Sequence, residues 1–220
     1  MCDVHGLLSD HDHEHVGEDE YVLDTPFVRE LIASVRARTT EASTPAEACE
    51  LVTPLFDGLM RNRDWLPSSY LCDAPESGMA GGIGQWLIYR SGSRDLCLFS
   101  LVVPPGAMTP IHDHLAWGLI GIYQGNQDEE IYRPGDGTIE VIRQRPLQPG
   151  DFYPLLPPRD DVHRVRTTSA DSSVSIHLLA NDTGCVLRHT YDEHTGETSP
   201  FRSGYVNAEC EDKPVVTTSC

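Results

Sequence analysis

The chain has 220 residues, with 34 acidic and 16 basic side chains and a formal net charge of −18 at pH 7. This length allows one sizeable core, so we expect a single domain. Such a charge argues against nucleic acid or an anionic membrane as partner. The sequence shows neither the ~18-residue apolar run of a membrane span nor a basic, apolar leader, which predicts a cytoplasmic protein.

The N-terminal third is expected to hold a tail followed by helices. Residues 1–24 are acidic and histidine-rich with few apolar side chains, which predicts a tail without stable structure. Thr25-Pro26 and Thr44-Pro45 each place an N-cap residue before a proline at the first helical position, and an apolar stripe follows each. Pro54 is expected to kink the second helix or to split it.

From residue 81 the pattern changes to short β-favouring runs separated by Gly, Pro, Asn and Asp. The expected strands are 85–89, 96–103, 117–123, 129–133, 138–143, 152–156, 163–167 and 173–179. This spacing is typical of an all-β barrel or sandwich. We therefore place one mainly β domain at residues 25–207 and a flexible polar tail at 208–220.

The seven cysteines are odd in number and contain no CxxC pair. This pattern argues against a disulfide framework and against a structural zinc site. Most of the cysteines are expected to be buried thiols or tail residues.

A short apolar stretch carries His112 and His114 two residues apart. Because side chains alternate along a strand, both histidines would point to one side and could share a cation. The pair alone is weak evidence for a metal site, since two histidines at this spacing also occur on the solvated faces of strands. Downstream, a Pro-Gly-Asp turn at 149–151 precedes a strand that carries His163, which completes a three-histidine set.

These two stretches resemble the two cupin motifs, although Gly118 and Leu119 stand where the first motif normally has Glu. The resemblance implies a single cupin, a small antiparallel β-barrel or jelly roll, here with N-terminal helices. More specifically, residues 109–121, 175–178 and 200–205 resemble the thiol dioxygenases of the cysteine dioxygenase superfamily, particularly the bacterial 3-mercaptopropionate dioxygenase branch. That likeness covers about residues 25–207.

The resemblance implies a mononuclear Fe(II) centre held by His112, His114 and His163. Such a centre oxidises a small thiol to its sulfinate with O2. Gly118 fits this family, which replaces the cupin Glu by Cys or Gly.

The resemblance also implies roles for five further residues. Gln85 and Arg188 match substrate-binding positions, with Arg188 gripping a carboxylate. From the residues alone, we would instead expect both to be surface side chains. Ser175 and His177 match the first two members of a Ser-x-His-x-Tyr relay, in which Ser175 orients the imidazole of His177. Leu179 replaces the relay Tyr and would line the substrate pocket.

Three alternatives stay open, the first of them because of Leu179. The chain could be a cupin oxygenase that acts on a larger or non-thiol substrate, or a lyase or isomerase that needs no O2. It could also be a non-catalytic cupin that binds a small ligand. We expect a monomer or a weak homo-oligomer whose partners are the small thiol and O2.

Overall fold

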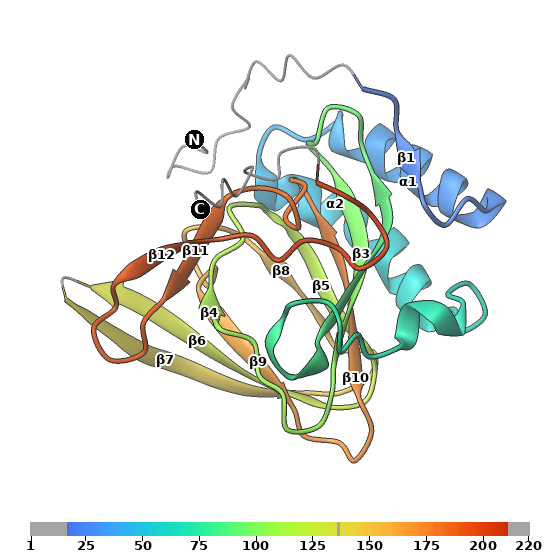
Figure 1. Ribbon diagram of the computed structural model, residues 1–220. Helices are drawn as coiled ribbons and strands as arrows, with labels where there is room; N and C mark the ends of the chain where they lie inside the picture. The colour runs from blue at the N-terminus through green and yellow to red at the C-terminus, as the bar shows by residue number, and fades with distance from the viewer. Residues whose placement is uncertain (1–16, 136, 211–220) are drawn as a thin grey trace, which may run out of the picture.

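The computed structural model describes residues 17–135 and 137–210, so the histidine-rich run at 10–15 lies outside the described residues. Two six-stranded antiparallel sheets face each other and form a jelly-roll barrel, with helices on one outer face (Figure 1). This mainly β architecture with N-terminal helices confirms the predicted fold class.

The first sheet has the order β1-β2-β3-β10-β5-β8. Its strands are β1 (Glu20–Tyr21), β2 (Gly84–Arg90), β3 (Cys97–Val103), β10 (Ser173–Leu179), β5 (Gly118–Gln124) and β8 (Phe152–Leu155). The second sheet has the order β12-β11-β4-β9-β6-β7. Its strands are β12 (Thr198–Phe201), β11 (Arg188–Tyr191), β4 (Ile111–His112), β9 (His163–Thr167), β6 (Gln127–Gly135) and β7 (Thr138–Leu147).

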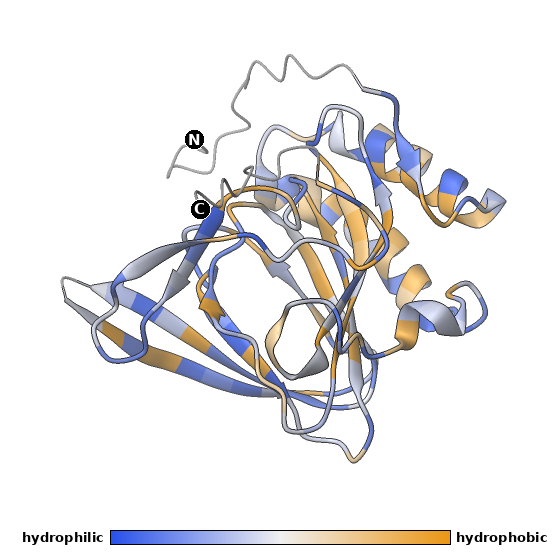
Figure 2. Cartoon of the chain, in the orientation of Figure 1, coloured by the Kyte–Doolittle hydropathy of each residue, from blue (hydrophilic) through white to orange (hydrophobic). Residues whose placement is uncertain are grey.

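Two helices, α1 (Pro26–Thr39) and α2 (Pro45–Arg61), cover the outer face of the first sheet. The hydroxyl of Thr25 accepts from the N–H of Val28, and that of Thr44 accepts from Glu47, so both predicted N-caps are confirmed. Pro54 does not split α2, which runs unbroken to Arg61. Figure 2 shows apolar residues concentrated where these helices meet the sheet. Two short 3₁₀ helices, Ser68–Leu71 and Ala80–Gly82, link α2 to β2.

The alternation along β10 separates two cores. Val174, Ile176 and Leu178 belong to the cluster beneath the helices. Ser175, His177 and Leu179 point the other way, into the barrel, where Leu179 joins an apolar cluster that includes Phe99. One strand therefore supports the helices with one face and lines the barrel interior with the other.

Several expectations at the two ends of the domain are wrong. Glu20 and Tyr21, assigned to the N-terminal tail, form β1 and pair with Arg90 and Tyr89 of β2. The short strands β11 and β12, at one side of the second sheet, were not predicted. Cys185 and Cys210 form a disulfide, so Cys210 is fixed to the domain rather than part of a flexible tail. In the described part of the chain, Cys49 and Cys97 are buried free thiols and Cys72 is an exposed one.

No helix among the described residues is both long enough and apolar enough to cross a membrane.

Candidate metal centre

Three buried histidines converge inside the barrel from β4, the loop after it and β9. His112 lies directly opposite His163 across the β4–β9 pair. His114 lies beyond the end of β4, so its approach depends on the loop rather than on strand alternation. The three ring centroids are 4.7–5.0 Å apart, and one nitrogen from each ring lies within 4.8 Å of the others. The predicted three-histidine set is therefore brought together.

The outer nitrogen of each ring faces an oxygen atom. Nδ1 of His112 lies 2.9 Å from the carbonyl oxygen of Pro110, and Nδ1 of His114 lies 3.2 Å from Oδ1 of Asp161. Nδ1 of His163 lies 2.5 Å from Oε1 of Glu129. A proton on each Nδ1 satisfies these contacts and leaves the Nε2 lone pairs for a shared cation.

Burial favours neutral rings, as metal ligands require. Burial, followed by the charge of the nearby Arg188, holds the pKa of His112 well below its usual range. Burial, with His163 as the next cause, does the same for His114. The donor set therefore fits a divalent transition metal bound by imidazole nitrogens, with further coordination positions left for ligands from solution.

Glu129 orients His163 and is itself held on all sides. Its side chain is completely buried, and Oε1 accepts from the hydroxyl of Tyr153 at 2.7 Å while Oε2 is paired with Arg145. Burial opposes ionisation, but the hydrogen bonds from His163 and Arg145 outweigh it and lower the pKa of this carboxyl to about 2. Glu129 is therefore an anion at neutral pH.

Asp161 has the same role toward His114. Its carboxylate accepts from the backbone N–H of His114 at 3.0 Å as well as facing the ring. Burial raises the pKa of Asp161 to about 6, although the backbone hydrogen bond opposes that shift. Asp161 fixes the backbone just before Leu115, which has a φ of 52°. This local conformation helps to bring His114 back toward the other two rings.

Next to the three rings lies the pair formed by Ser175 and His177. The Ser175 hydroxyl is 3.0 Å from Nε2 of His177, and the ring of Phe99 stacks on the imidazole at 4.6 Å between centroids. The ring of His114 is 6.4 Å away. Nδ1 of His177 is buried and has no hydrogen-bond partner in the described structure, which leaves it for a bound ligand.

Gln85 lies on the inner face of β2, across from Leu101 of β3. It is buried, and its Nε2 has no hydrogen-bond partner among the described residues. The interpretation of Gln85 as a surface residue is therefore wrong. Leu179 is fully buried within the inner apolar cluster, so the barrel wall is apolar at this position.

Arg188 is also buried rather than on the surface, with 4% of its area exposed. Its guanidinium donates from Nε to the Thr183 carbonyl, from Nη1 to the Asp113 carbonyl and from Nη2 to the Ser203 hydroxyl, at 3.0, 2.6 and 2.9 Å. None of the described carboxylates forms an ion pair with it. Burial lowers the pKa of Arg188 to about 10, so it remains a cation at neutral pH.

The guanidinium and the histidines lie on the same side of the second sheet. Thr190 is the β-sheet partner of His112, so its side chain points to the same side as that of His112. Arg188 is two residues before Thr190 on β11, so its side chain also points inward. The ring of Phe201 lies 4.7 Å from the guanidinium carbon and 6.4 Å from the His112 ring. A buried positive charge thus lies beside the three-histidine cluster.

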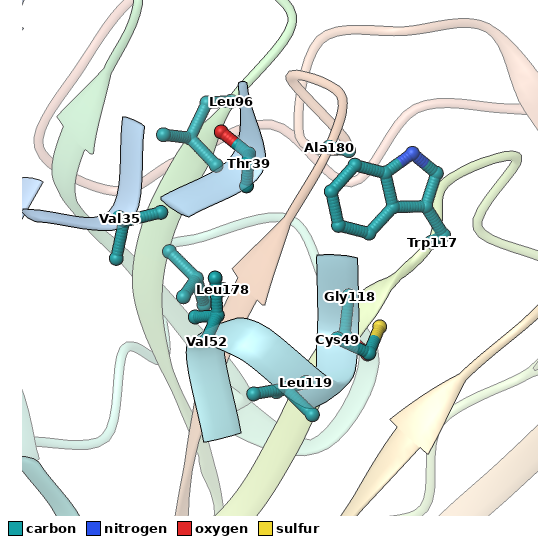
Figure 3. Close-up of a pocket in the computed structure, with 10 residues that line it drawn as sticks. All are labelled: Val35, Thr39, Cys49, Val52, Leu96, Trp117, Gly118, Leu119, Leu178 and Ala180. Atoms are coloured by element: carbon teal, nitrogen blue, oxygen red, sulfur yellow. The ribbon is translucent and has the colours of Figure 1, made fainter. Parts of the chain in front are cut away.

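A small hollow on the other side of the first sheet is unrelated to this centre. It is lined by α1, α2, β5 and β10, and Figure 3 shows Cys49, Trp117, Leu119 and Leu178 around it. Its volume of about 10 Å³ has room for about one water molecule.

Sequence reasoning did not find Glu129, Asp161 or Tyr153. Glu129 and Asp161 lie 34 and 47 residues in sequence from the histidines that they contact, and Tyr153 lies 24 residues from Glu129, to which it donates. One observation could have pointed to Glu129. An acidic residue on the inner face of a buried strand requires polar or charged partners.

No family model matches the sequence. Solved structures with partial similarity include a protein with a double-stranded β-helix domain from Klebsiella pneumoniae, at 13% identity over 64% of this chain and 97% of that one, TM-score 0.40. A cupin domain of a transcriptional regulator from Enterobacter cloacae matches at 18% identity over 44% and 94%, TM-score 0.34. Oxalate decarboxylase of Lactobacillus farciminis matches at 14% identity over 41%, TM-score 0.34, and only 25% of its own length is covered. We draw the function from the residues of this chain alone, and the resemblance to thiol dioxygenases stays a prediction.

Proposed function

We propose that the protein is a non-haem Fe(II) dioxygenase that oxidises a small carboxylate-bearing thiol to its sulfinate. The overall change is RS⁻ + O2 → RSO2⁻, in which both oxygen atoms go to sulfur and no further reductant is needed. The observation that supports it is the buried Arg188 cation, without a carboxylate ion pair in the described structure, beside three buried histidines whose ring nitrogens converge.

The buried guanidinium favours an anionic ligand. Asp113 and Asp161 stabilise the Arg188 charge only without an ion pair, and burial of an unpaired ion costs on the order of several kcal/mol, so a carboxylate from solution that hydrogen-bonds the guanidinium would offset more of that cost. A guanidinium has five N–H donors and three are used, so two remain for a ligand. Two parallel hydrogen bonds to a carboxylate would both bind the substrate and orient it.

His112, His114 and His163 would hold the iron, and imidazole ligands carry no negative charge that would reduce the positive charge of the metal. A ferrous ion bound there would supply coordination positions for the thiolate and O2 and the redox chemistry that joins them. Arg188 fixes the far end of the substrate, so the sulfur is held in one place. Nδ1 of His177 can hydrogen-bond a polar atom of the bound reactants, and Ser175 fixes the imidazole through Nε2.

The test is O2 uptake by the Fe(II)-loaded protein with 3-mercaptopropionate and with ethanethiol. Replacing any of the three ligand histidines by Ala should abolish iron binding and activity. His194→Ala, in an exposed turn, is the matched control and should change neither. Full iron content in all three ligand variants would contradict the assignment.

Arg188→Gln tests the substrate class. A hydrogen bond to a charged group is worth about 1.5–3 kcal/mol, so KM for 3-mercaptopropionate should rise about 10- to 100-fold, while KM for ethanethiol should change little. Arg188→Lys keeps the charge but not the planar fork. Its KM for 3-mercaptopropionate should therefore lie between those of the wild type and of Arg188→Gln. Equal effects on both thiols would rule out carboxylate recognition by Arg188.

The apolar wall favours a second candidate. Leu179 and Phe99 line the inner cluster beside His177, which suits a larger or non-thiol substrate of the same kind of oxygenase. Uptake of O2 with bulky apolar substrates, and none with small thiols, would favour it. Binding of iron and a carboxylate without any O2 uptake would instead indicate a ligand-binding cupin.

A further inference from the structure

Besides the Asp113 carbonyl after β4, two segments outside the strands hold the Arg188 side chain. One is the loop formed by residues 182–187, whose Thr183 carbonyl accepts from Nε. The other is the strap formed by residues 202–210, whose Ser203 hydroxyl accepts from Nη2. The direction of the guanidinium therefore depends on how these two segments lie relative to each other.

The loop and the strap are joined to each other at several points. The N–H of Gly204 donates to the Gly184 carbonyl at 2.8 Å, and the Tyr205 hydroxyl donates to Oδ1 of Asp182 at 2.8 Å. The disulfide between Cys185 and Cys210 adds a covalent bond between the loop and the end of the strap. The Tyr205 ring also lies against Gly184, where a Cβ would be 2.4 Å from it.

The strap is anchored at its far side to the first sheet. The N–H of Val206 donates to the Gln85 carbonyl, and the Asn207 side chain exchanges two hydrogen bonds with the backbone of Leu87. Nη2 of the buried Arg90 donates to the Glu209 carbonyl at 2.9 Å. Figure 1 shows this segment running from β12 across to the side of β2 and β3.

We propose that the Cys185–Cys210 disulfide, together with the strap that it closes, positions Arg188 and so determines specificity for an anionic substrate. This inference rests on the proposed function, because it concerns the carboxylate that Arg188 would bind. The disulfide prevents the strap from moving away from the loop, and Ser203 and Thr183 then hold two of the three guanidinium nitrogens. Its loss leaves the iron ligands in place and loosens only the anion-binding end of the site.

The test is the Cys185→Ser/Cys210→Ser double variant, with Cys72→Ser as the matched control because Cys72 is a free, exposed thiol. Variants are preferable to a reductant, since thiol substrates can themselves exchange with a disulfide. In the double variant, KM for 3-mercaptopropionate should rise about five- to ten-fold, with kcat, iron content and KM for ethanethiol close to wild type. Cys72→Ser should match wild type throughout. Mass spectrometry should confirm that the wild-type disulfide survives the assay.

Two measurements are independent of turnover. Hydrogen–deuterium exchange should become faster in residues 182–188 and 202–207 of the double variant, while β9 and β10 keep wild-type rates. Binding of 3-hydroxypropionate, a carboxylate that cannot exchange with the disulfide, should weaken by the same factor as KM rises.

An unchanged Kd for 3-hydroxypropionate, or equal rises of KM for both thiols, would overturn the proposal. Absence of O2 uptake by the wild-type protein with every thiol would overturn the proposed function instead. The exchange and binding measurements would still report on the strap in that case.

Discussion

Glu129 shows how one buried carboxylate can affect the whole centre. It accepts from Nδ1 of His163 and is itself held by Tyr153 and Arg145, so the imidazole is oriented by a fixed anion. A carboxylate behind a ligand histidine fixes the ring and raises its basicity. We therefore expect Glu129 to strengthen metal binding without contacting the metal.

Glu129→Gln should weaken metal binding about 10- to 100-fold, because the amide can still accept from His163 but carries no charge. The measurement is metal affinity by competition with a coloured chelator. Glu130→Gln is the matched control, since the neighbouring Glu130 pairs with Tyr132 and Arg164 and does not contact a ligand histidine. Equal affinities for the two variants would show that the charge of Glu129 is unimportant.

At the scale of the elements, the approach of β5 to β10 depends on a missing side chain. A Cβ at Gly118 would lie 2.1 Å from the Leu178 carbonyl oxygen and 2.9 Å from the Leu179 side chain. Backbone cannot move aside as easily as a flexible side chain can. The pairing of β5 with the strand that carries His177 therefore requires glycine at this position.

Gly118→Ala should lower the free energy of unfolding by at least about 2 kcal/mol, because the added methyl group overpacks the β5–β10 contact. Gly58→Ala provides the opposite control. Gly58 is exposed within α2 and a Cβ there meets nothing within 4 Å, so alanine should stabilise the helix by about 0.5–1 kcal/mol. Urea unfolding of both variants tests the pair, and a stable Gly118→Ala protein would contradict the role of Gly118.

The central strands could be predicted from sequence, and the segments around them could not. β9 and β10 have the predicted bounds, because alternating and β-branched residues bounded by turns mark them clearly. β11 and β12 are four-residue strands of mixed polarity at one side of the second sheet, and strands this short give little periodicity. The Cys185–Cys210 pair spans 25 residues without a motif, so only the folded chain reveals it.

The candidate metal ligands could likewise be predicted from the sequence, and the residues that hold them could not. The histidine spacing identified the three candidate ligands, although His114 reaches its place through a loop that Asp161 holds. That carboxylate and Glu129 are distant in sequence from the histidines that they contact, and a single sequence carries no signal for such pairs. The burial of Arg188 depends on the loop and the strap together, so its unpaired charge is visible only in three dimensions.

At the scale of the whole molecule, the net charge of −18 opposes the approach of an anionic substrate. Salt screens such repulsion over a Debye length of about 10 Å at 0.1 M. For 3-mercaptopropionate, kcat/KM should therefore increase as sodium chloride is raised from low ionic strength, whereas ethanethiol should show no change. A decrease for the carboxylate thiol would mean that attraction near Arg188 dominates the approach.

Metal binding should also stabilise the folded chain as a whole. The histidines converge only in the folded state. A metal that binds there therefore raises the free energy of unfolding by RT ln(1 + [M]/Kd), which is about 2.7 kcal/mol at a metal concentration of 100 Kd. Tm should rise on addition of Fe(II) under nitrogen and fall back with a chelator, and His163→Ala should remove the response. An equal rise in that variant would place the stabilising site elsewhere.

The two faces of β10 also bear on how such a protein could diverge. Val174, Ile176 and Leu178 maintain the packing beneath the helices, while Ser175, His177 and Leu179 face the barrel interior. Substitutions at the odd-numbered positions can therefore alter the reaction with little effect on the helix-facing core. A lineage could therefore replace Ser175, His177 or Leu179, retain its fold and acquire activity on other substrates.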